Sequence, residues 1–237
     1  MGFTALKFEP FPGPMRSYIS RQDEKTAVEN VRIVREAVGP DVDILVEVHR
    51  RLSPMSAIRV AKEIAELKPF WYEEPLLVEN VDALAEVRSR IDLPVVTGET
   101  LCTKVNFRDV LDKRAADILN PDVSHCGGIL ELKEIAAMAE ANYVAVCPHN
   151  HNSTTVSLAA TLQVAATIPN FLITEYFVNF TQKGNEILKN PFKLVDGHFV
   201  IPTGPGLGID IDEEALAQLT YSQSTARKFR TVSEERI

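Results

Sequence analysis

Short apolar runs alternate with amphipathic segments along most of the chain. The runs at 44–46 and 70–72 have the length of buried strands. Between them, apolar residues recur every three or four positions, as in Ala27, Val31 and Val34, which is the pattern of one helical face. Strand and helix thus alternate in units of roughly 25 residues, and this alternation is typical of parallel strands joined by helical crossovers.

The pattern predicts one continuous series of strand–helix units. Helices are expected over residues 23–38, 53–67, 81–87, 107–111, 127–139 and 154–167, and the second of them should begin with Ser53 as a cap before Pro54. Strands are expected over residues 2–8, 43–49, 70–73, 93–97, 117–119, 143–147 and 171–174. So many units favour a (β/α) barrel of the TIM type over a small open sheet. In such barrels the chemistry lies at the C-terminal ends of the strands.

The strand–helix pattern ends after residue 175. Residues 190–208 are rich in proline and glycine, which predicts an extended excursion. Residues 217–237 are polar with mixed charge, and we expect a loosely attached helix or a partly disordered tail there. The chain should therefore comprise a barrel domain over residues 1–188 and a C-terminal extended segment with a tail over residues 189–237.

Composition narrows the class of protein. Apolar residues make up 45% of the chain, which supplies an ample core, and the formal net charge of −8 argues against binding to nucleic acid or to an anionic membrane. No apolar run is long enough to span a bilayer, and the first residues lack the apolar region of a signal peptide. Three widely spaced cysteines favour a reducing compartment, so we expect a cytoplasmic protein.

Six of the predicted strands have an ionisable residue at their end or within three positions of it. A single carboxylate at a strand end commonly caps the next helix or pairs with a surface lysine, but six at one structural level point to a shared site. In the first of these strands, Glu47 and His49 lie two positions apart and are expected to point to the same face. The six residues, whose spacing follows the strand–helix repeat, are Glu47, Glu73, Glu99, Asp122, His149 and Glu175.

The first three of these carboxylates predict a metal site. Hard oxygen ligands favour Mg²⁺, and without a cation Glu47, Glu73 and Glu99 would repel one another. A bound divalent ion can hold an enolate oxygen. Further along the chain, Asp122 is expected to orient His149, which makes His149 a candidate general base.

The remaining polar residues suggest how a substrate could be handled. Glu175 could hydrogen-bond a substrate carboxylate oxygen, and His49 is expected across the mouth from His149, so that one imidazole takes a proton while the other gives one to a leaving hydroxyl. Lys7 could neutralise substrate charge or pair instead with Glu9 or a metal ligand. The weaker candidates for substrate binding are Arg50, His151 and Lys7.

Taken together, the motifs resemble the barrel domain of the enolase superfamily, in its mandelate racemase subgroup. The matching stretches cover nearly all of residues 2–210, and they are Val46-Glu47-Val48-His49, Tyr72-Glu73-Glu74-Pro75, Thr97-Gly98-Glu99, Asn120-Pro121-Asp122, Cys147-Pro148-His149 and Thr174-Glu175. The resemblance implies Mg²⁺ bound by the first glutamate of the Glu-Glu-Pro motif together with Glu47 and Glu99. It also implies that His149 removes the proton α to a carboxylate with Asp122 as its partner, and that Glu175 lies near the enolate oxygens.

Within this subgroup the chain resembles sugar-acid dehydratases of the galactonate and mannonate type. His49 is similar to their general acid, whereas racemases carry a Lys-x-Lys pair where this chain has Lys7-Phe8-Glu9. The resemblance implies a hydro-lyase acting on a hexonate or pentonate. Such an enzyme abstracts the C2 proton to give a metal-stabilised enediolate and eliminates the C3 hydroxyl to give a 2-keto-3-deoxy sugar acid.

Two alternatives remain open at the level of the sequence. The chain could be a racemase or epimerase of the same subgroup, or a catalytically inactive fragment that acts only in assembly. The second alternative arises because the N-terminal capping domain and the first barrel strand of the family are missing before Gly2. Residues 189–237 would pack on such a cap. The expected partners are a small acid sugar and further copies of the chain, with no nucleic acid and no membrane.

Overall fold

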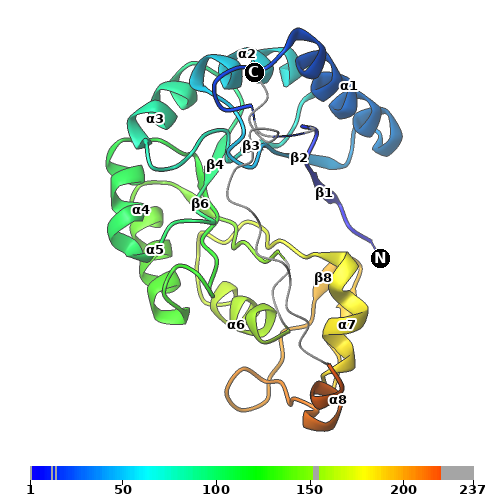
Figure 1. Cartoon of the computed structure of the whole chain (residues 1–237). Coiled ribbons are helices and arrows are strands. Elements are labelled where there is room, and N and C mark those ends of the chain that lie inside the picture. Colours follow the sequence, from blue (N-terminus) through cyan, green and yellow to red (C-terminus); the bar gives the residue numbers. More distant parts are fainter. Residues whose placement is uncertain (1, 12, 14, 152–154, 220–237) are drawn as a thin grey trace.

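The computed structural model describes residues 2–11, 13, 15–151 and 155–219. Its main sheet is entirely parallel and follows chain order from β1 to β6. Figure 1 shows these strands as an arc with helices α1 to α6 around the outside. The strands are β1 (Ala5–Phe8), β2 (Asp43–Glu47), β3 (Trp71–Glu73), β4 (Val95–Thr97), β5 (Ile118–Leu119) and β6 (Ala145–Val146).

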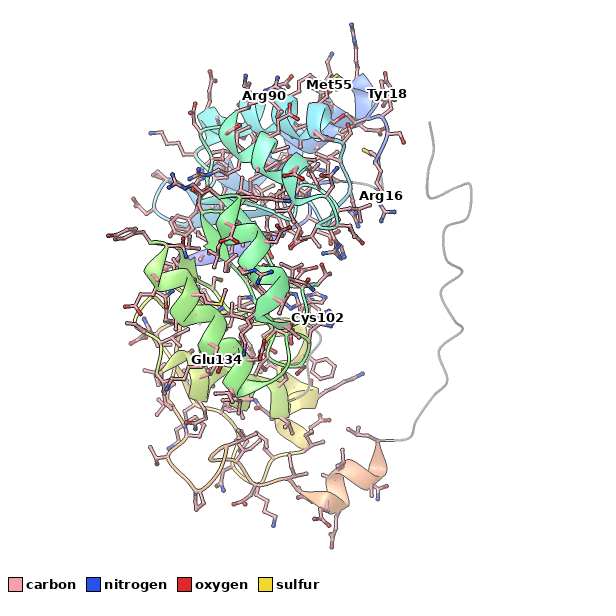
Figure 2. The ribbon with its side chains drawn as sticks, turned by 90° about the vertical axis from the view of Figure 1, so that its left-hand side faces the viewer. Arg16, Tyr18, Met55, Arg90, Cys102 and Glu134 are labelled. Carbon is pink, nitrogen blue, oxygen red and sulfur yellow. The ribbon has the colours of Figure 1, made fainter. Side chains whose placement is uncertain are left out.

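The outer helices begin and end where local chemistry favours it. Helix α1 (Arg21–Val38) is capped by Ser20, whose hydroxyl accepts from the Asp23 N–H at 3.1 Å, and it ends at Gly39, where φ is 78°. Figure 2 shows polar side chains such as Arg90 and Glu134 on the outside of this helical layer. The other helices of the layer are α2 (Pro54–Ile64), α3 (Val81–Ser89), α4 (Thr103–Asp112), α5 (Ile129–Ala141) and α6 (Thr155–Ala165).

Strand alternation divides the core into an outer and an inner part. In β2, Ile44 and Val46 pack outward against the helices, whereas Leu45 points inward. Leu45 pairs with Trp71 in the ladder, and the inner layer is completed by Val96, Ile118 and Cys147. Residues two positions further along β2 and β3 point the same way, so Glu47 and Glu73 lie directly above this inner layer.

The predicted incomplete barrel is confirmed, because β1 pairs with β2 alone among the described residues and the sheet does not close. The predicted strand at 171–174 is wrong as an element. Only Phe171 bridges to Val146, with Leu172 donating to the Val146 carbonyl at 2.9 Å. The predicted strand at 43–49 is two residues too long, since β2 ends at Glu47. Ser53 does precede α2, but its hydroxyl contacts Ser56 and does not cap the helix.

The segment after Glu175 is built from short elements. A 3-10 helix (Val178–Phe180) and α7 (Thr181–Glu186) lead to a hairpin of β7 (Leu194–Val195) and β8 (His198–Phe199) and then to α8 (Glu213–Gln218). A second 3-10 helix (Ala65–Leu67) extends α2. The expected tail over 217–237 lies almost wholly outside the described residues. Within the described part of the chain, every helix is too short or too polar to cross a bilayer.

Candidate active site at the carboxyl ends of the strands

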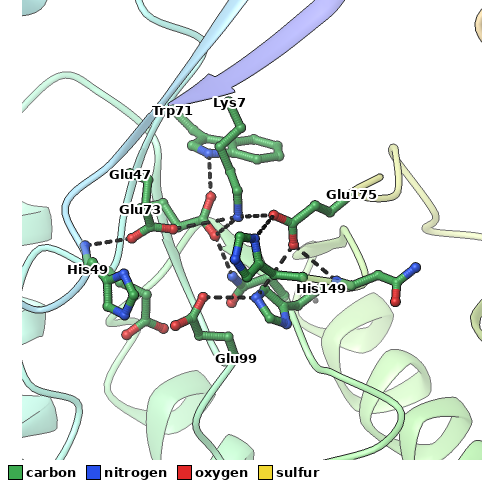
Figure 3. A network of polar contacts seen from close by, with 12 residues as sticks. Lys7, Glu47, His49, Trp71, Glu73, Glu99, His149 and Glu175 are labelled. Carbon is green, nitrogen blue, oxygen red and sulfur yellow. Dashed lines mark hydrogen bonds and ion pairs between the residues drawn. The ribbon is translucent and has the colours of Figure 1, made fainter. Parts of the chain in front are cut away.

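Three glutamates form a carboxylate cluster inside the arc. Glu47 and Glu73 are the last residues of β2 and β3 and pair with each other in the ladder, and Glu99 follows β4 by two positions. One carboxylate oxygen from each of the three lies within 4.8 Å of the other two. The sheet therefore brings together the three side chains that the sequence predicted as metal ligands, which are hereafter called the carboxylate cluster (Figure 3).

Glu73 is fixed by hydrogen bonds from three directions. The indole N–H of Trp71 donates to its Oε2 at 2.9 Å, and the Asn120 amide donates to its Oε1 at 2.9 Å. The Lys7 ammonium, from β1, donates to the same Oε1 at 2.8 Å. Because Glu73 is only 1% exposed, these donors compensate a carboxylate that has little contact with water.

Lys7 provides positive charge to both sides of the site. Its Nζ lies 2.8 Å from Glu175 Oε1 and 3.6 Å from Glu47 Oε2, in addition to its contact with Glu73. Burial lowers the pKa of Lys7, but the neighbouring carboxylates outweigh that effect and hold the pKa well above its usual value. Burial, with repulsion from Glu73, raises the pKa of Glu47 well above its usual value. The cluster thus has more negative charge than Lys7 alone compensates.

Arg50 contacts the third member of the cluster. Its guanidinium forms an ion pair with Glu99, and its Nη1 lies 3.5 Å from Glu74 Oε2. Burial raises the pKa of Glu99, but His149 and Arg50 more than reverse this, so the net pKa of Glu99 is lowered. Arg50, predicted as a substrate contact, therefore binds carboxylates of the site itself.

Asp122 and His149 form a second unit, hereafter the imidazole pair. His149 Nδ1 lies 2.7 Å from Asp122 Oδ2, and its Nε2 lies 3.3 Å from Glu99 Oε2 and 3.4 Å from Glu175 Oε2. Burial lowers the pKa of His149, but the hydrogen bond to Asp122 and the two glutamates outweigh it, so the pKa is raised. Asp122 thus orients one ring nitrogen and leaves the other pointing toward the carboxylate cluster.

His49 does not share a strand face with Glu47. The strand ends first, and both His49 and Arg50 adopt the left-handed backbone region, with φ of 54° and 63°. The imidazole is 46% exposed, and its Nδ1 lies 2.6 Å from Glu9 Oε1. Arg51 holds the other Glu9 oxygen at 2.8 Å. His49 therefore has a carboxylate partner of its own, as His149 does.

Glu175 and His151 complete the inner wall. The Asn150 N–H donates to Glu175 Oε2 at 3.0 Å, while Lys7 contacts Oε1. Burial raises the pKa of Glu175, but Lys7 and His149 outweigh it, so the pKa is lowered and the carboxylate stays ionised. His151 is half exposed, with its ring 4.3 Å from that of Phe177 and its Nδ1 3.9 Å from Glu175 Oε1.

A further histidine lies apart from this network. His125 Nε2 lies 3.0 Å from the Thr100 carbonyl oxygen and 3.4 Å from the Cys102 sulfur. Cys102 precedes α4 and is exposed, as Figure 2 shows. His125 therefore has the structural hydrogen bond that its place in a loop suggests.

Several residues of the site were not predicted from the sequence. Trp71 and Asn120 support Glu73, Glu9 supports His49, and Glu74 is fully buried beside the cluster. A signal existed for Glu74, since it adjoins Glu73 in the Glu-Glu-Pro motif. The resemblance, however, assigns the metal to the first glutamate of that motif, and so it gives Glu74 no role.

The donor set fits a hard divalent cation. Three carboxylates converge at the ends of adjacent strands, and their oxygens are the ligand type that Mg²⁺ prefers. The raised pKa of Glu47 shows that this group of charges favours additional positive charge. Beside it, the imidazole pair offers a buried base whose free nitrogen faces the cluster. This arrangement suits removal of a proton next to a carboxylate.

Comparisons with known proteins agree with this geometry. Residues 1–215 match the family described as "Enolase C-terminal domain-like". The chain is 34% identical over 216 residues to a D-gluconate dehydratase of Thermoproteus tenax, covering 91% of this chain and 43% of that protein. It is also 34% identical over 220 residues to a D-gluconate/D-galactonate dehydratase of Picrophilus torridus, covering 93% of this chain and 56% of the relative.

Solved structures give the same result. A mandelate racemase/muconate lactonizing enzyme-like protein from Rubrobacter xylanophilus has a TM-score of 0.88 at 36% identity, covering 93% of this chain and 58% of its own. A similarly described protein from Roseovarius sp. TM1035 has a TM-score of 0.84 at 39% identity, covering 91% and 55% of the two chains. The chain spans about half the length of the curated relatives it matches. The chain belongs to the enolase superfamily, through a domain like the C-terminal barrel domain of enolase.

Proposed function

We propose that this chain forms the catalytic barrel of a Mg²⁺-dependent acid-sugar dehydratase. The observation that carries the proposal is the imidazole pair beside the carboxylate cluster, with His149 Nε2 only 3.3 Å from Glu99. The curated relatives described above are D-gluconate and D-galactonate dehydratases, which supports a hexonate or pentonate as substrate. Because the chain spans only part of those relatives, the activity and substrate of the whole protein belong to the proposal.

Glu47, Glu73 and Glu99 would hold the cation. When bound, Mg²⁺ supplies positive charge that stabilises negative charge on substrate carboxylate oxygens. Trp71, Asn120 and Lys7 keep the Glu73 carboxylate in place through the hydrogen bonds described above.

Proton removal falls to His149. Its Nδ1 is held by Asp122, so Nε2 is the nitrogen free to accept the C2 proton of an acid sugar. The C–H bond breaks, its electron pair passes into an enediolate, and the proton goes to Nε2. Lys7 lies at the same level, 2.8 Å from Glu175, and its ammonium would contact the substrate carboxylate. An ionised Glu175 has no proton to donate to that carboxylate, so its part in the site is to hold Lys7 and to face His149.

Loss of the hydroxyl falls to His49. Glu9 holds its Nδ1 at 2.6 Å, which leaves Nε2 to donate a proton to the departing C3 oxygen. The C3–O bond then breaks, water leaves, and the resulting enol tautomerises to a 2-keto-3-deoxy sugar acid. Glu9 also occupies the place of the second lysine in the racemases. It is a partner for His49 and provides no ammonium base on the opposite face, which favours elimination over racemisation. Arg50 and His151 would contact the remaining hydroxyls of the substrate only after leaving the carboxylates that they contact in this structure.

The proposal is tested with a library of hexonates and pentonates in D₂O with Mg²⁺. The chain is assayed alone and mixed with the separately expressed, unmatched part of the Picrophilus relative. Formation of 2-keto acid is followed together with deuterium uptake at C2. His149→Asn should abolish both signals, whereas His49→Gln should abolish water loss and retain exchange. His125→Asn removes an imidazole outside the site and serves as the matched control.

The outcomes separate the candidate functions. Water loss that depends on His149 and His49 supports the dehydratase. Exchange at C2 without water loss in the unsubstituted protein supports a racemase or epimerase. No turnover and no exchange with any acid sugar, in either form, would refute the proposal and favour a chain that acts only in assembly. Mass measurement in solution tests the expected homo-oligomer separately.

A further inference from the structure

Glu74 is a buried acid that the proposed chemistry leaves without a role. It is 0% exposed, although it immediately follows a metal-ligand candidate, and its φ is 45°. Glu74 lies one position beyond the end of β3, in a backbone region that is uncommon for residues other than glycine. Burying a carboxyl group without function is costly, which makes its contacts informative.

The contacts of Glu74 converge on the turn that carries Glu99. Its Oε1 accepts from the Thr97 hydroxyl and from the Gly98 N–H, both at 2.8 Å. Its own N–H donates to the Val96 carbonyl at 2.9 Å, and its carbonyl accepts from the Arg50 N–H at 2.6 Å. Glu74 therefore links the ends of β2 and β4, and it fixes the residue directly before Glu99.

The second carboxylate oxygen of Glu74, unlike the first, accepts no hydrogen bond from the described residues. This Oε2 is buried, and the nearest cation is Arg50 Nη1 at 3.5 Å. The same guanidinium forms an ion pair with Glu99. Arg50 thus contacts two carboxylates, that of the candidate metal ligand Glu99 and that of the buried Glu74. The Oε2 of Glu74 still has room for a closer contact with the guanidinium.

We infer that Glu74 is a positioning residue that sets the divalent-cation affinity of the carboxylate cluster by drawing Arg50 away from Glu99. A cation held by Glu99 would compete electrostatically with the guanidinium for that carboxylate. A negative Glu74 gives Arg50 an alternative partner, and the hydrogen bonds to Thr97 and Gly98 keep Glu99 directed at the site. This inference rests on the metal site of the proposed function, but it concerns binding alone and not the reaction.

The test uses Mg²⁺ titration of the full chain, by calorimetry and by tryptophan fluorescence. Trp71 is the single tryptophan and donates to Glu73, so it reports on the cluster without any substrate. Glu74→Gln is nearly isosteric and retains an oxygen for Thr97 and Gly98 while removing the charge that faces Arg50. We expect Mg²⁺ to bind about 10- to 100-fold more weakly, the usual loss when a group behind a metal ligand is changed.

A double-mutant cycle separates positioning from packing. In an Arg50→Met background the competing cation is gone, so Glu74→Gln should have at most a small effect on Mg²⁺ affinity. Arg50→Met alone should bind Mg²⁺ more tightly than the unsubstituted chain, and this arm stands even if Glu74→Gln fails to fold. Thr97→Val removes one hydrogen bond to Glu74 without changing charge, and it should weaken Mg²⁺ binding less than Glu74→Gln does.

Each outcome of these titrations either supports or contradicts the inference. Weaker binding in Glu74→Gln that Arg50→Met suppresses supports the inference. Equal affinities in Glu74→Gln and the unsubstituted chain, or an equal loss in both Arg50 backgrounds, would overturn it while leaving the metal site intact. An unsubstituted chain that binds no divalent cation would refute the metal site itself, and with it both this inference and the Mg²⁺ dependence of the proposed function.

Discussion

The carboxylate cluster and the imidazole pair lie a few ångströms apart but are stabilised in opposite ways. Glu47 and Glu73 end hydrogen-bonded strands and point inward because of strand alternation. Asp122 and His149 lie beyond β5 and β6 and are joined to each other by a single isolated bridge. The sheet thus positions two members of the cluster directly, whereas Glu99 and the pair depend on the turns and loops that follow the strands.

The two units also differ in charge balance. In the cluster, burial and mutual repulsion raise the pKa of Glu47, so its stability depends on cations supplied from elsewhere. In the pair, Asp122 provides the charge that His149 needs, and the pKa of the imidazole is raised in spite of burial. The stability and Mg²⁺ affinity of the cluster should therefore depend on the cations around it. The pKa of His149 should depend on its hydrogen bond to Asp122.

The largest expected effect comes from removing a charge in the cluster. Glu73→Gln deletes the carboxylate at its centre, and Mg²⁺ affinity should fall by more than about 100-fold, beyond the loss typical of groups behind the ligands. Calorimetric titration measures the change. Asp122→Asn is the companion variant from the other unit, and its Mg²⁺ affinity should stay within a few-fold of the unsubstituted chain. Similar losses in both variants would show that the two units do not act separately.

Asp122→Asn should instead change the reaction and its pH dependence. A base works in its neutral form, so kcat/KM falls as the pH drops below the pKa of His149. Removing the Asp122 carboxylate lowers that pKa, and the acidic limb of the profile should move to lower pH as the rate falls by about 100-fold or more. The profile is recorded by deuterium uptake at C2. An unmoved limb would mean that another group is the base.

Lys7 lies between the carboxylate cluster and Glu175, and its replacement tests how far the cluster depends on it. Lys7→Met leaves Glu47, Glu73 and Glu175 without their shared cation, and removing one partner from a buried ion pair costs about 3 to 5 kcal/mol. Urea unfolding measures the loss. Saturating Mg²⁺ should recover more stability in this variant than in the unsubstituted chain. Equal Mg²⁺ effects would show that the ion and the ammonium do not act on the same carboxylates.

Sequence reasoning succeeded where the backbone is regular. The apolar runs identified the strands β1 to β6, and strand-end residues such as Glu47 and Glu73 meet because parallel strands end at one edge. The contact between Asp122 and His149 followed from the same logic. These inferences need only side-chain period and strand order, both of which hydrophobic patterning specifies.

The same reasoning failed where single residues leave the regular backbone. His49 and Glu74 adopt positive φ just beyond the ends of β2 and β3, where strand alternation no longer fixes the direction of a side chain. Positive φ is uncommon for every residue other than glycine, so the sequence alone does not reveal that conformation at His49 or Glu74. The short strand expected at 171–174 failed for a related reason, since only Phe171 finds a neighbouring strand to pair with. Pairing depends on the partner as well as on local preference.

The smallest expected effect on stability is that of replacing Gly98, which lies in the turn before Glu99. Its φ of +141° is a glycine conformation, and an added Cβ would lie 2.7 Å from Phe107 Cε1 and 3.2 Å from Asn120 Oδ1. Gly98→Ala should destabilise the chain by about 1 to 3 kcal/mol from strain at this position. Gly39→Ala is the matched control, because Gly39 also has positive φ but no atom within 4 Å of an added Cβ.

Gly98→Ala also tests whether the carboxylate cluster and the imidazole pair are positioned separately. Gly98 directly precedes Glu99 and donates to Glu74, so its replacement should weaken Mg²⁺ binding as well as stability, whereas Gly39→Ala should affect stability alone. The imidazole pair is held through other strands, so the pH limb of deuterium uptake should not move in Gly98→Ala. If it moves as far as in Asp122→Asn, the cluster and the pair form one mechanical unit, and their separate positioning by strand and by loop is refuted.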